Sequence, residues 1–176
     1  MKATGIVRRI DDLGRVVIPK EIRRVMRIRE GDPLEIFTDR EGEVIFKKYS
    51  PIGELSDFAA DYCESLHKTG GLCAFVCDCD AFIAAAGVPK KEFLEQKLPE
   101  ALEALLAARG LYRFRRGMEA VRLADGFFLS TLAPILAQGD LRGAVGSVSK
   151  EPAEATDTAC DLCKTAAAFL AKQLEE

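Results

Sequence analysis

The chain has 176 residues and a net charge of −3, with 25 Lys and Arg against 28 Asp and Glu. This length fits one domain, or a small module followed by a domain of about 100 to 150 residues. No apolar run approaches the ~20 residues that a membrane-spanning helix requires, and the start of the sequence shows no secretory signal. We therefore expect a cytoplasmic protein whose six cysteines remain thiols.

Positive charge is concentrated at the start of the chain. Residues 1–29 contain nine basic and three acidic residues, a net charge of +6. Because the whole chain carries −3, residues 30–176 carry −9. This asymmetry favours an N-terminal surface that binds a polyanion, although a merely solvated charged face is the commoner origin of such a run.

A change of composition divides the chain near residues 49–53. All six cysteines, and every alanine except Ala3, lie beyond this point. We therefore expect two domains, at 1–53 and 54–176.

The first module is predicted to consist of short strands and one helix. Apolar and basic residues alternate over 4–10, and a second strand is expected over 15–18 after a turn. Pro19 suits the first turn of a helix. The apolar residues of this helix fall on one face, which is expected to point inward: Ile18, Ile22, Val25 and Met26. Residues 33–37 and 44–49 are expected to form a hairpin.

A module of about 50 residues buries too little apolar surface to be comfortably stable alone. Disulfides, a metal or oligomerisation usually supply the missing stability. Residues 1–53 contain neither cysteine nor histidine, so oligomerisation remains. A dimer would also double the basic surface.

The second module is predicted to be α+β, an antiparallel sheet flanked by helices. The dipeptide Asp125-Gly126 between two apolar runs predicts a type I′ hairpin, and QGD at 138–140 predicts a second hairpin, with no turn type assigned. Helices are expected near 55–68, 98–110 and 156–174, and strands or extended segments near 72–79, 81–87, 112–116, 119–123, 127–137 and 141–149.

The closing helix carries two apolar stripes. The first has heptad-like spacing, and the second runs beside it. A helix that is apolar on two sides is expected to pack on its own sheet and on a partner helix. The first stripe is Cys160, Cys163, Ala167, Leu170 and Leu174, and the second is Ala159, Leu162, Ala166 and Phe169.

The first 49 residues resemble the AbrB family of bacterial transition-state regulators. The motifs GIVRRID, LGRVVIPKEIRR and GDPLEIF carry a long and nearly ungapped match. The resemblance implies an N-terminal all-β swapped-hairpin barrel with a short helix, formed by two interleaved chains. It also implies a sequence-selective transcription regulator that binds double-stranded DNA.

The rest of the chain resembles the sporulation regulators of this family, in which the module precedes a GAF-like domain. The match is looser and rests on CDCDAFIAAAGVPKKEFL (77–94) and LEALLAARG (102–110). It departs from the family at Cys77, at Cys79 and at alanines 84–86. The resemblance implies a sporulation regulator at the nucleoid of the forespore, dimeric or, through helices of the GAF-like domain, tetrameric.

The resemblance also assigns DNA-contacting residues. The principal arginines are Arg8, Arg15, Arg23 and Arg24, and the supporting positive residues are Lys2, Arg9, and Lys47 or Lys48. Arginine suits this role because its planar fork holds a phosphate or a guanine edge with two hydrogen bonds. Most such contacts are expected to go to phosphates.

No catalytic constellation is expected, nor a cofactor. The pairs Cys77–Cys79 and Cys160–Cys163 could offer thiolates to zinc, but Cys-x-Cys lacks the usual spacing and buried cysteine usually packs as a small hydrophobe. His67 is the only histidine, so a relay that needs two is excluded. A pocket for an unidentified effector could lie between the sheet and residues 88–117, near Arg113, Arg115 and Arg116.

Two alternative functions remain open. Some antitoxins of toxin–antitoxin pairs share the N-terminal fold, but they typically add a short acidic tail rather than 123 folded residues. Some GAF-type enzymes use cysteine redox chemistry, which would require an exposed thiol of low pKa.

Overall fold

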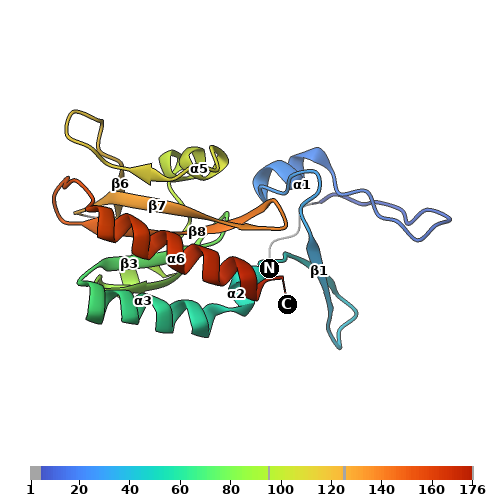
Figure 1. Cartoon of the computed structure of the whole chain (residues 1–176). Helices are drawn as coiled ribbons and strands as arrows, with labels where there is room; N and C mark the ends of the chain where they lie inside the picture. Colours follow the sequence, from blue (N-terminus) through green and yellow to red (C-terminus); the bar gives the residue numbers. More distant parts are fainter. Residues whose placement is uncertain (1–4, 95, 125, 176) are drawn as a thin grey trace. The chain divides into compact units, whose positions relative to one another are not determined.

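The computed structural model describes residues 5–94, 96–124 and 126–175. The chain separates into two compact units, Met1–Tyr49 and Ser50–Glu176 (Figure 1).

Within residues 5–49, the N-terminal unit contains one short helix and one two-stranded hairpin. Helix α1 (Lys20–Val25) begins after Pro19, as predicted. Strand β1 (Leu34–Thr38) pairs antiparallel with β2 (Val44–Lys48). Gly42 adopts a φ of 85° in the connecting turn, a conformation that favours glycine.

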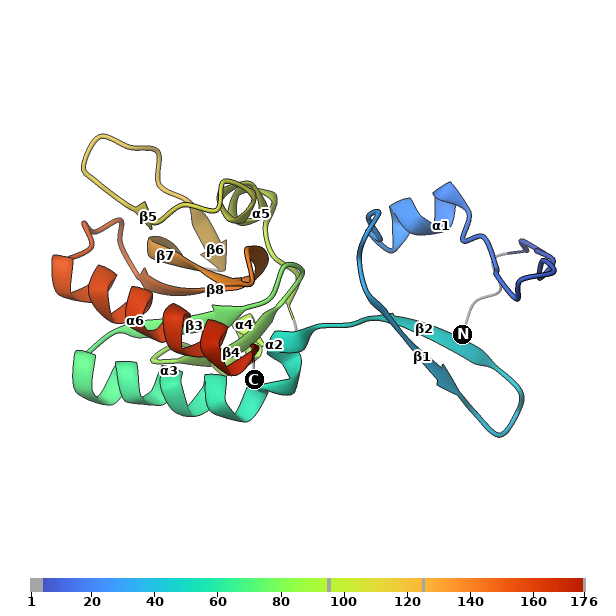
Figure 2. The ribbon, with the colours of Figure 1, turned by 45° about the vertical axis from the view of Figure 1, so that its right-hand side comes forward.

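The segment before α1 differs from the prediction. Residues 5–10 and 15–18 flank a tight turn, but no strand is assigned to either within the described chain (Figure 2, blue). The predicted strands are therefore wrong for a single chain. A strand is assigned only where a neighbouring segment pairs with it in a ladder, and no such ladder is assigned to these two segments within the described residues.

The apolar face of α1 also differs from the prediction. No residue of α1 is buried, and the Val25 and Met26 side chains are 78% and 55% exposed. Ile18 and Ile22 are half-buried, so the predicted inward face is covered only in part within the described residues of this unit. Many other large apolar side chains of this unit are exposed: Ile6, Val7, Ile10, Leu13, Val16, Val17, Ile36, Phe37, Val44 and Phe46.

The C-terminal unit is built on a six-stranded antiparallel sheet. Its strands follow the order β4-β3-β8-β7-β5, and β6 pairs separately with β7. The strands are β3 (Cys73–Cys77), β4 (Phe82–Ala86), β5 (Tyr112–Arg113), β6 (Arg122–Ala124), β7 (Phe127–Ala137) and β8 (Asp140–Ser149). This arrangement confirms the predicted antiparallel α+β class.

Helices cover both faces of this sheet. Helices α3 (Ser56–Gly70) and α6 (Asp157–Gln173) lie side by side on one face (Figures 1 and 2). The short α4 (Lys90–Phe93) and α5 (Glu100–Ala107) contribute to the core on the other face. A further short helix, α2 (Pro51–Glu54), precedes α3 and buries Ile52 completely. Neither α2 nor α4 was predicted from the sequence.

The alternation of strand residues produces two separate cores. On β3, Ala74 and Val76 join the core beneath α3 and α6, whereas Phe75 and Cys77 join the core on the other face. The second core contains a chain of aromatic contacts. Its ring-centroid distances are 5.2 Å for Phe75–Phe82, 5.2 Å for Phe82–Phe93 and 5.6 Å for Phe93–Phe127.

The predicted turns of this unit are found in part. Gln138 and Gly139 both have positive φ between β7 and β8, as a two-residue type I′ turn requires. Asp125, in the other predicted turn, lies outside the described residues. Strand β3 ends at Cys77, so Cys79 lies in the following turn rather than on the predicted strand.

Candidate nucleic-acid interface

The turn at residues 11–15 is organised by one carboxylate. Asp11 Oδ1 accepts hydrogen bonds from the backbone N–H groups of Leu13 (3.0 Å) and Arg15 (2.8 Å). Asp11 Oδ2 accepts a 2.8 Å hydrogen bond from Arg15 Nε. These bonds lower the pKa of Asp11, so the carboxylate is ionised at neutral pH. The turn therefore fixes Arg15 at its backbone and at its side chain.

Helix α1 presents two of the predicted arginines to solvent. Arg23 and Arg24 are both exposed. The helix ends in a Schellman motif, in which the Ile28 N–H donates to the Arg23 carbonyl (2.8 Å) and Arg27 N–H to the Arg24 carbonyl (3.3 Å). Arg27 occupies the left-handed position, with a φ of 53°, that glycine usually takes.

The lysines of β2 have partners within the same unit. Lys48 Nζ lies 3.3 Å from Asp32 Oδ2 and donates to the Arg27 carbonyl at 3.3 Å. Lys47 Nζ lies 4.7 Å from the centre of the Phe37 ring. Lys48 thus ties β2 to the end of α1, which gives it a structural role that the sequence analysis missed.

The remaining predicted residues lie before the turn. Arg8 and Arg9 are exposed on the extended segment 5–10, and Lys2 lies outside the described residues. The four principal arginines therefore come from three elements: the extended segment, the turn and α1. Asp11 was also missed, although its i,i+4 spacing to Arg15 was a usable signal.

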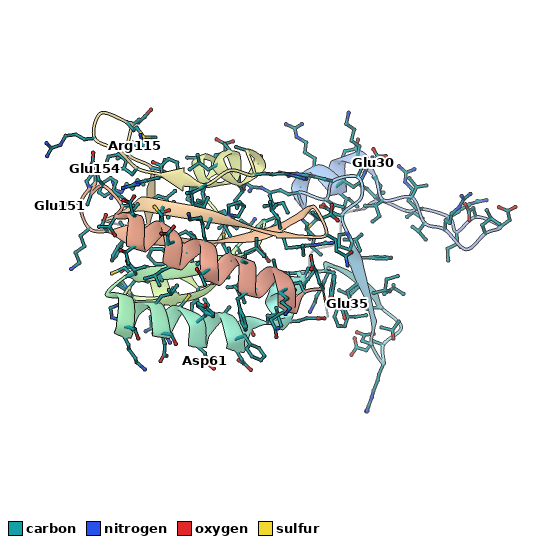
Figure 3. The ribbon with its side chains drawn as sticks, viewed as in Figure 1. Glu30, Glu35, Asp61, Arg115, Glu151 and Glu154 are labelled. Atoms are coloured by element: carbon teal, nitrogen blue, oxygen red, sulfur yellow. The ribbon has the colours of Figure 1, made fainter. Side chains whose placement is uncertain are left out.

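The C-terminal unit contains a cavity of about 670 Å³ between two loops. Its lining is Phe114, Arg116, Gly117, Pro152, Ala153 and Glu154. The Arg116 backbone N–H donates to Glu154 Oε1 at 2.7 Å and joins the two loops. Arg115, Glu151 and Glu154 lie at the same end of the unit (Figure 3). The cavity thus includes Arg116, near which the sequence predicts an effector pocket, together with residues 152–154 of a second loop.

The cysteines are mostly buried, as expected from packing. Burial raises the pKa of Cys63 and of Cys163 to about 12 and also raises that of Cys77. Cys73 Sγ donates to the Gly87 carbonyl at 3.2 Å, and Cys79 Sγ to the Leu141 carbonyl at 3.7 Å. Within the described ranges, no group of three or more His, Cys, Asp or Glu side chains is arranged to hold a metal. Nor does any helix there have the length and hydropathy to span a membrane.

Comparisons with known proteins identify the family. A family described as "Stage V sporulation protein T C-terminal, transcription factor" matches residues 54–175. Stage V sporulation protein T of Bacillus subtilis (strain 168) is 50% identical over 180 residues, covering all of both chains. The chain belongs to the stage V sporulation protein T family. This confirms the predicted resemblance and function class, a transcription regulator with a GAF-like second domain.

The N-terminal unit has its own relatives. The transition state regulatory protein AbrB of Bacillus subtilis (strain 168) is 56% identical over 63 residues, which cover 32% of this chain and 65% of AbrB. A family described as "Antidote-toxin recognition MazE, bacterial antitoxin" matches residues 7–53. The first unit of this stage V sporulation protein T relative is therefore AbrB-like, as predicted.

The fold of the C-terminal unit matches solved GAF domains. The GAF domain of a phosphoenolpyruvate-protein phosphotransferase from Coxiella burnetii aligns with a TM-score of 0.52 at 17% identity. The alignment covers 68% of this chain and 82% of that domain. At this identity the likeness concerns the fold alone, and it confirms the GAF-like architecture.

Proposed function

We propose that this chain is a sequence-selective DNA-binding transcription regulator whose N-terminal domains interleave as a homodimer. The DNA-binding face consists of Arg8, Arg15, Arg23 and Arg24 from each chain. The observation that carries the proposal is the exposure of all four arginines on an AbrB-like unit of net positive charge. The domains are 1–53 for DNA binding and 54–176 for regulation and oligomerisation.

Interleaving of two chains would explain both the missing strands at 5–10 and 15–18 and the exposed apolar residues at the end of α1. No strand is assigned at residues 5–10 and 15–18 in the single chain, and in the proposed dimer a second copy of the same segments pairs with them as strands. In the proposed dimer, the exposed side chains of Val25 and Met26 would be buried against the second chain. One association satisfies both hydrogen bonding and apolar burial.

The DNA contacts follow from arginine chemistry. Arg23 and Arg24 extend from α1, and Arg15 extends from the turn that precedes it. We assign most of these contacts to phosphates and a minority to base edges. Lys47 and Arg9 supply supporting charge, as does Lys2. Lys48 forms a salt bridge with Asp32, so it contributes less to DNA binding than an unpaired lysine would.

A second association is proposed through the GAF-like domain. The rings of Tyr62 on α3 and Phe169 on α6 lie 5.5 Å apart, and Phe169 is 39% exposed. Phe58, also on α3, is 54% exposed. An apolar surface across two adjacent helices fits the same surface of a second copy, which would make a dimer of dimers.

The cavity at Arg116 and Glu154 is the proposed binding site for a small-molecule effector of unassigned identity. We also propose action in the forespore, following the family.

The test begins with selection of duplexes from a random DNA pool by the full-length protein. The expected result is enrichment of a common sequence, which then binds more tightly than an unrelated duplex of equal length. Alanine variants at Arg15, Arg23 and Arg24 are expected to lose affinity while they keep the wild-type melting temperature and mass. Failure to enrich any sequence would contradict sequence-selective binding.

The antitoxin alternative rests on the MazE match at residues 7–53. A folded second unit of the size found here argues against it, because a toxin is usually wrapped by a flexible tail that orders on binding. The thiol-enzyme alternative is disfavoured because the raised pKa values of Cys63 and Cys163 keep these thiols neutral at physiological pH.

A further inference from the structure

The turn that carries Arg15 also carries a negative charge. An ionised carboxylate on a surface that binds a polyanion weakens binding by like-charge repulsion, so its presence there calls for a specific role. Asp11 is also more covered than its partner. The Asp11 side chain is 36% exposed, against 69% for Arg15.

The two oxygens of the Asp11 carboxylate accept hydrogen bonds from different groups. Oδ1 accepts the backbone N–H groups of Leu13 and Arg15 and so shapes the turn. Oδ2 accepts Arg15 Nε–H at 2.8 Å and so holds the guanidinium. The backbone closes the same turn, with the Asp11 N–H donating to the Arg15 carbonyl at 3.1 Å and Gly14 N–H to the Asp11 carbonyl at 3.0 Å. Gly14 has a φ of 76°, which suits glycine.

This contact leaves most of the guanidinium available to a ligand. Arginine has five N–H donors, and Asp11 engages the one on Nε. The four donors on Nη1 and Nη2 are those that form a two-pronged contact with a phosphate or a guanine edge. An arginine already fixed at Nε loses less side-chain freedom when it binds than an unrestrained arginine loses.

We propose that Asp11 is a positioning residue for DNA binding, which orients the Arg15 guanidinium through Nε and presents its terminal nitrogens to DNA. The inference rests on the proposed function, because it requires Arg15 to contact DNA. It adds a residue that touches no DNA itself and whose removal weakens binding despite the removal of a negative charge.

The test compares two charge-matched substitutions in the full-length protein. Asp11→Asn keeps an oxygen to accept the turn N–H groups but loses the ionic contact to Nε. Asp12→Asn removes the same charge from the adjacent exposed residue. Each is combined with Arg15→Ala, and all are titrated with the selected duplex and with an unrelated duplex. Melting temperature and mass check that each variant is folded and assembled.

We expect Asp11→Asn to weaken binding to the selected duplex by at least about 5-fold, because a charge-assisted hydrogen bond is lost. Asp12→Asn is expected to leave binding unchanged or to tighten it. In the Arg15→Ala background, Asp11→Asn is expected to change affinity by less than about 2-fold. The Arg15 Nε–H signal in NMR spectra is expected to be sharp and shifted in the wild type and to lose that shift in Asp11→Asn.

Two results would overturn the inference while the DNA-binding face stands. One is an Asp11→Asn variant that binds like Asp12→Asn, and the other is an equal loss with and without Arg15. A different result, unchanged affinity on Arg15→Ala alone, would contradict Arg15 as a DNA contact and the positioning role with it.

Discussion

The ring of Phe75 on β3 lies over the backbone of its cross-strand partner, Gly146 on β8. A Cβ at position 146 would overlap the Phe75 ring and crowd the Thr131 carbonyl on β7. Phe75 is fully buried and belongs to the aromatic chain through Phe82 and Phe93. Gly146, in the glycine-rich stretch GAVGS at 143–147, therefore serves packing within a strand.

Gly146→Ala is accordingly expected to destabilise the C-terminal unit by roughly 1–3 kcal/mol, because an added methyl overpacks a filled core. Gly110→Ala is the matched control, since the contact nearest to a Cβ there is an ordinary 3.8 Å. Urea unfolding measures both variants. A Gly146→Ala variant as stable as Gly110→Ala would show that the ring and backbone are not in contact.

A charge on the uncovered N-terminal surface is expected to disrupt assembly. Val17 is 72% exposed in a single chain, so Val17→Asp would cost little if the chain were a monomer. In the interleaved dimer, the same change buries a carboxylate and is expected to lower the dimer's stability by several kcal/mol. Thr38→Asp, at an exposed polar position of β1, is the control. Sedimentation and the concentration dependence of the melting temperature distinguish the two cases.

The buried thiols predict a loss of stability in alkali. The pKa of Cys63 and of Cys163 lies near 12 in the folded chain, against an ordinary value of 9.0. Below pH ~9 both states keep the protons. As pH rises from ~9 to ~12, the unfolded chain releases protons that the folded chain retains, so the free energy of unfolding falls. A Cys63→Ala/Cys163→Ala variant is expected to show a shallower fall, and a fall as steep as in the wild type would contradict this origin.

If the GAF-like domains associate, a charged substitution in their apolar surface is expected to lower the mass of the oligomer. Phe169→Asp on α6 is expected to convert a tetramer to a dimer, because it places a charge in the apolar surface shared with Phe58 and Tyr62. Ala168→Asp, at an exposed position of the same helix, is expected to leave the tetramer intact. Light scattering at micromolar protein concentration measures both. A wild-type protein that is already dimeric would contradict the second interface.

The sequence predicted most of what local pattern and turn chemistry determine. The hairpin of β1 and β2, the antiparallel sheet and the closing helix follow from periodicity and from turn residues such as Gly139. The segments 5–10 and 15–18 were predicted as strands because their alternation is real, but a strand forms only where another strand can pair with it. The local pattern of a sequence carries no information about whether such a partner strand is available.

The candidate site was predictable in its residues but not in their interactions. Family resemblance identified Arg15, Arg23 and Arg24, all exposed in the structure. The roles of Asp11 and Lys48 depend on hydrogen bonds to Arg15 Nε and to the Arg27 carbonyl. Such contacts require the folded turn and the folded hairpin, so composition and spacing alone did not reveal them.

The most direct test of the DNA-binding face is the salt dependence of affinity for the selected duplex. If a dimer neutralises six to ten phosphates, affinity is expected to fall roughly 10³- to 10⁵-fold between 50 and 200 mM salt. Arg23→Ala and Arg24→Ala each remove a contact from both chains, so the slope of log affinity against log salt is expected to fall by about two where the arginine binds phosphate. Arg40→Ala, at an exposed arginine of the β1–β2 turn, is expected to retain the wild-type slope. Folded Arg15, Arg23 and Arg24 alanine variants with the affinity and slope of Arg40→Ala would contradict the account.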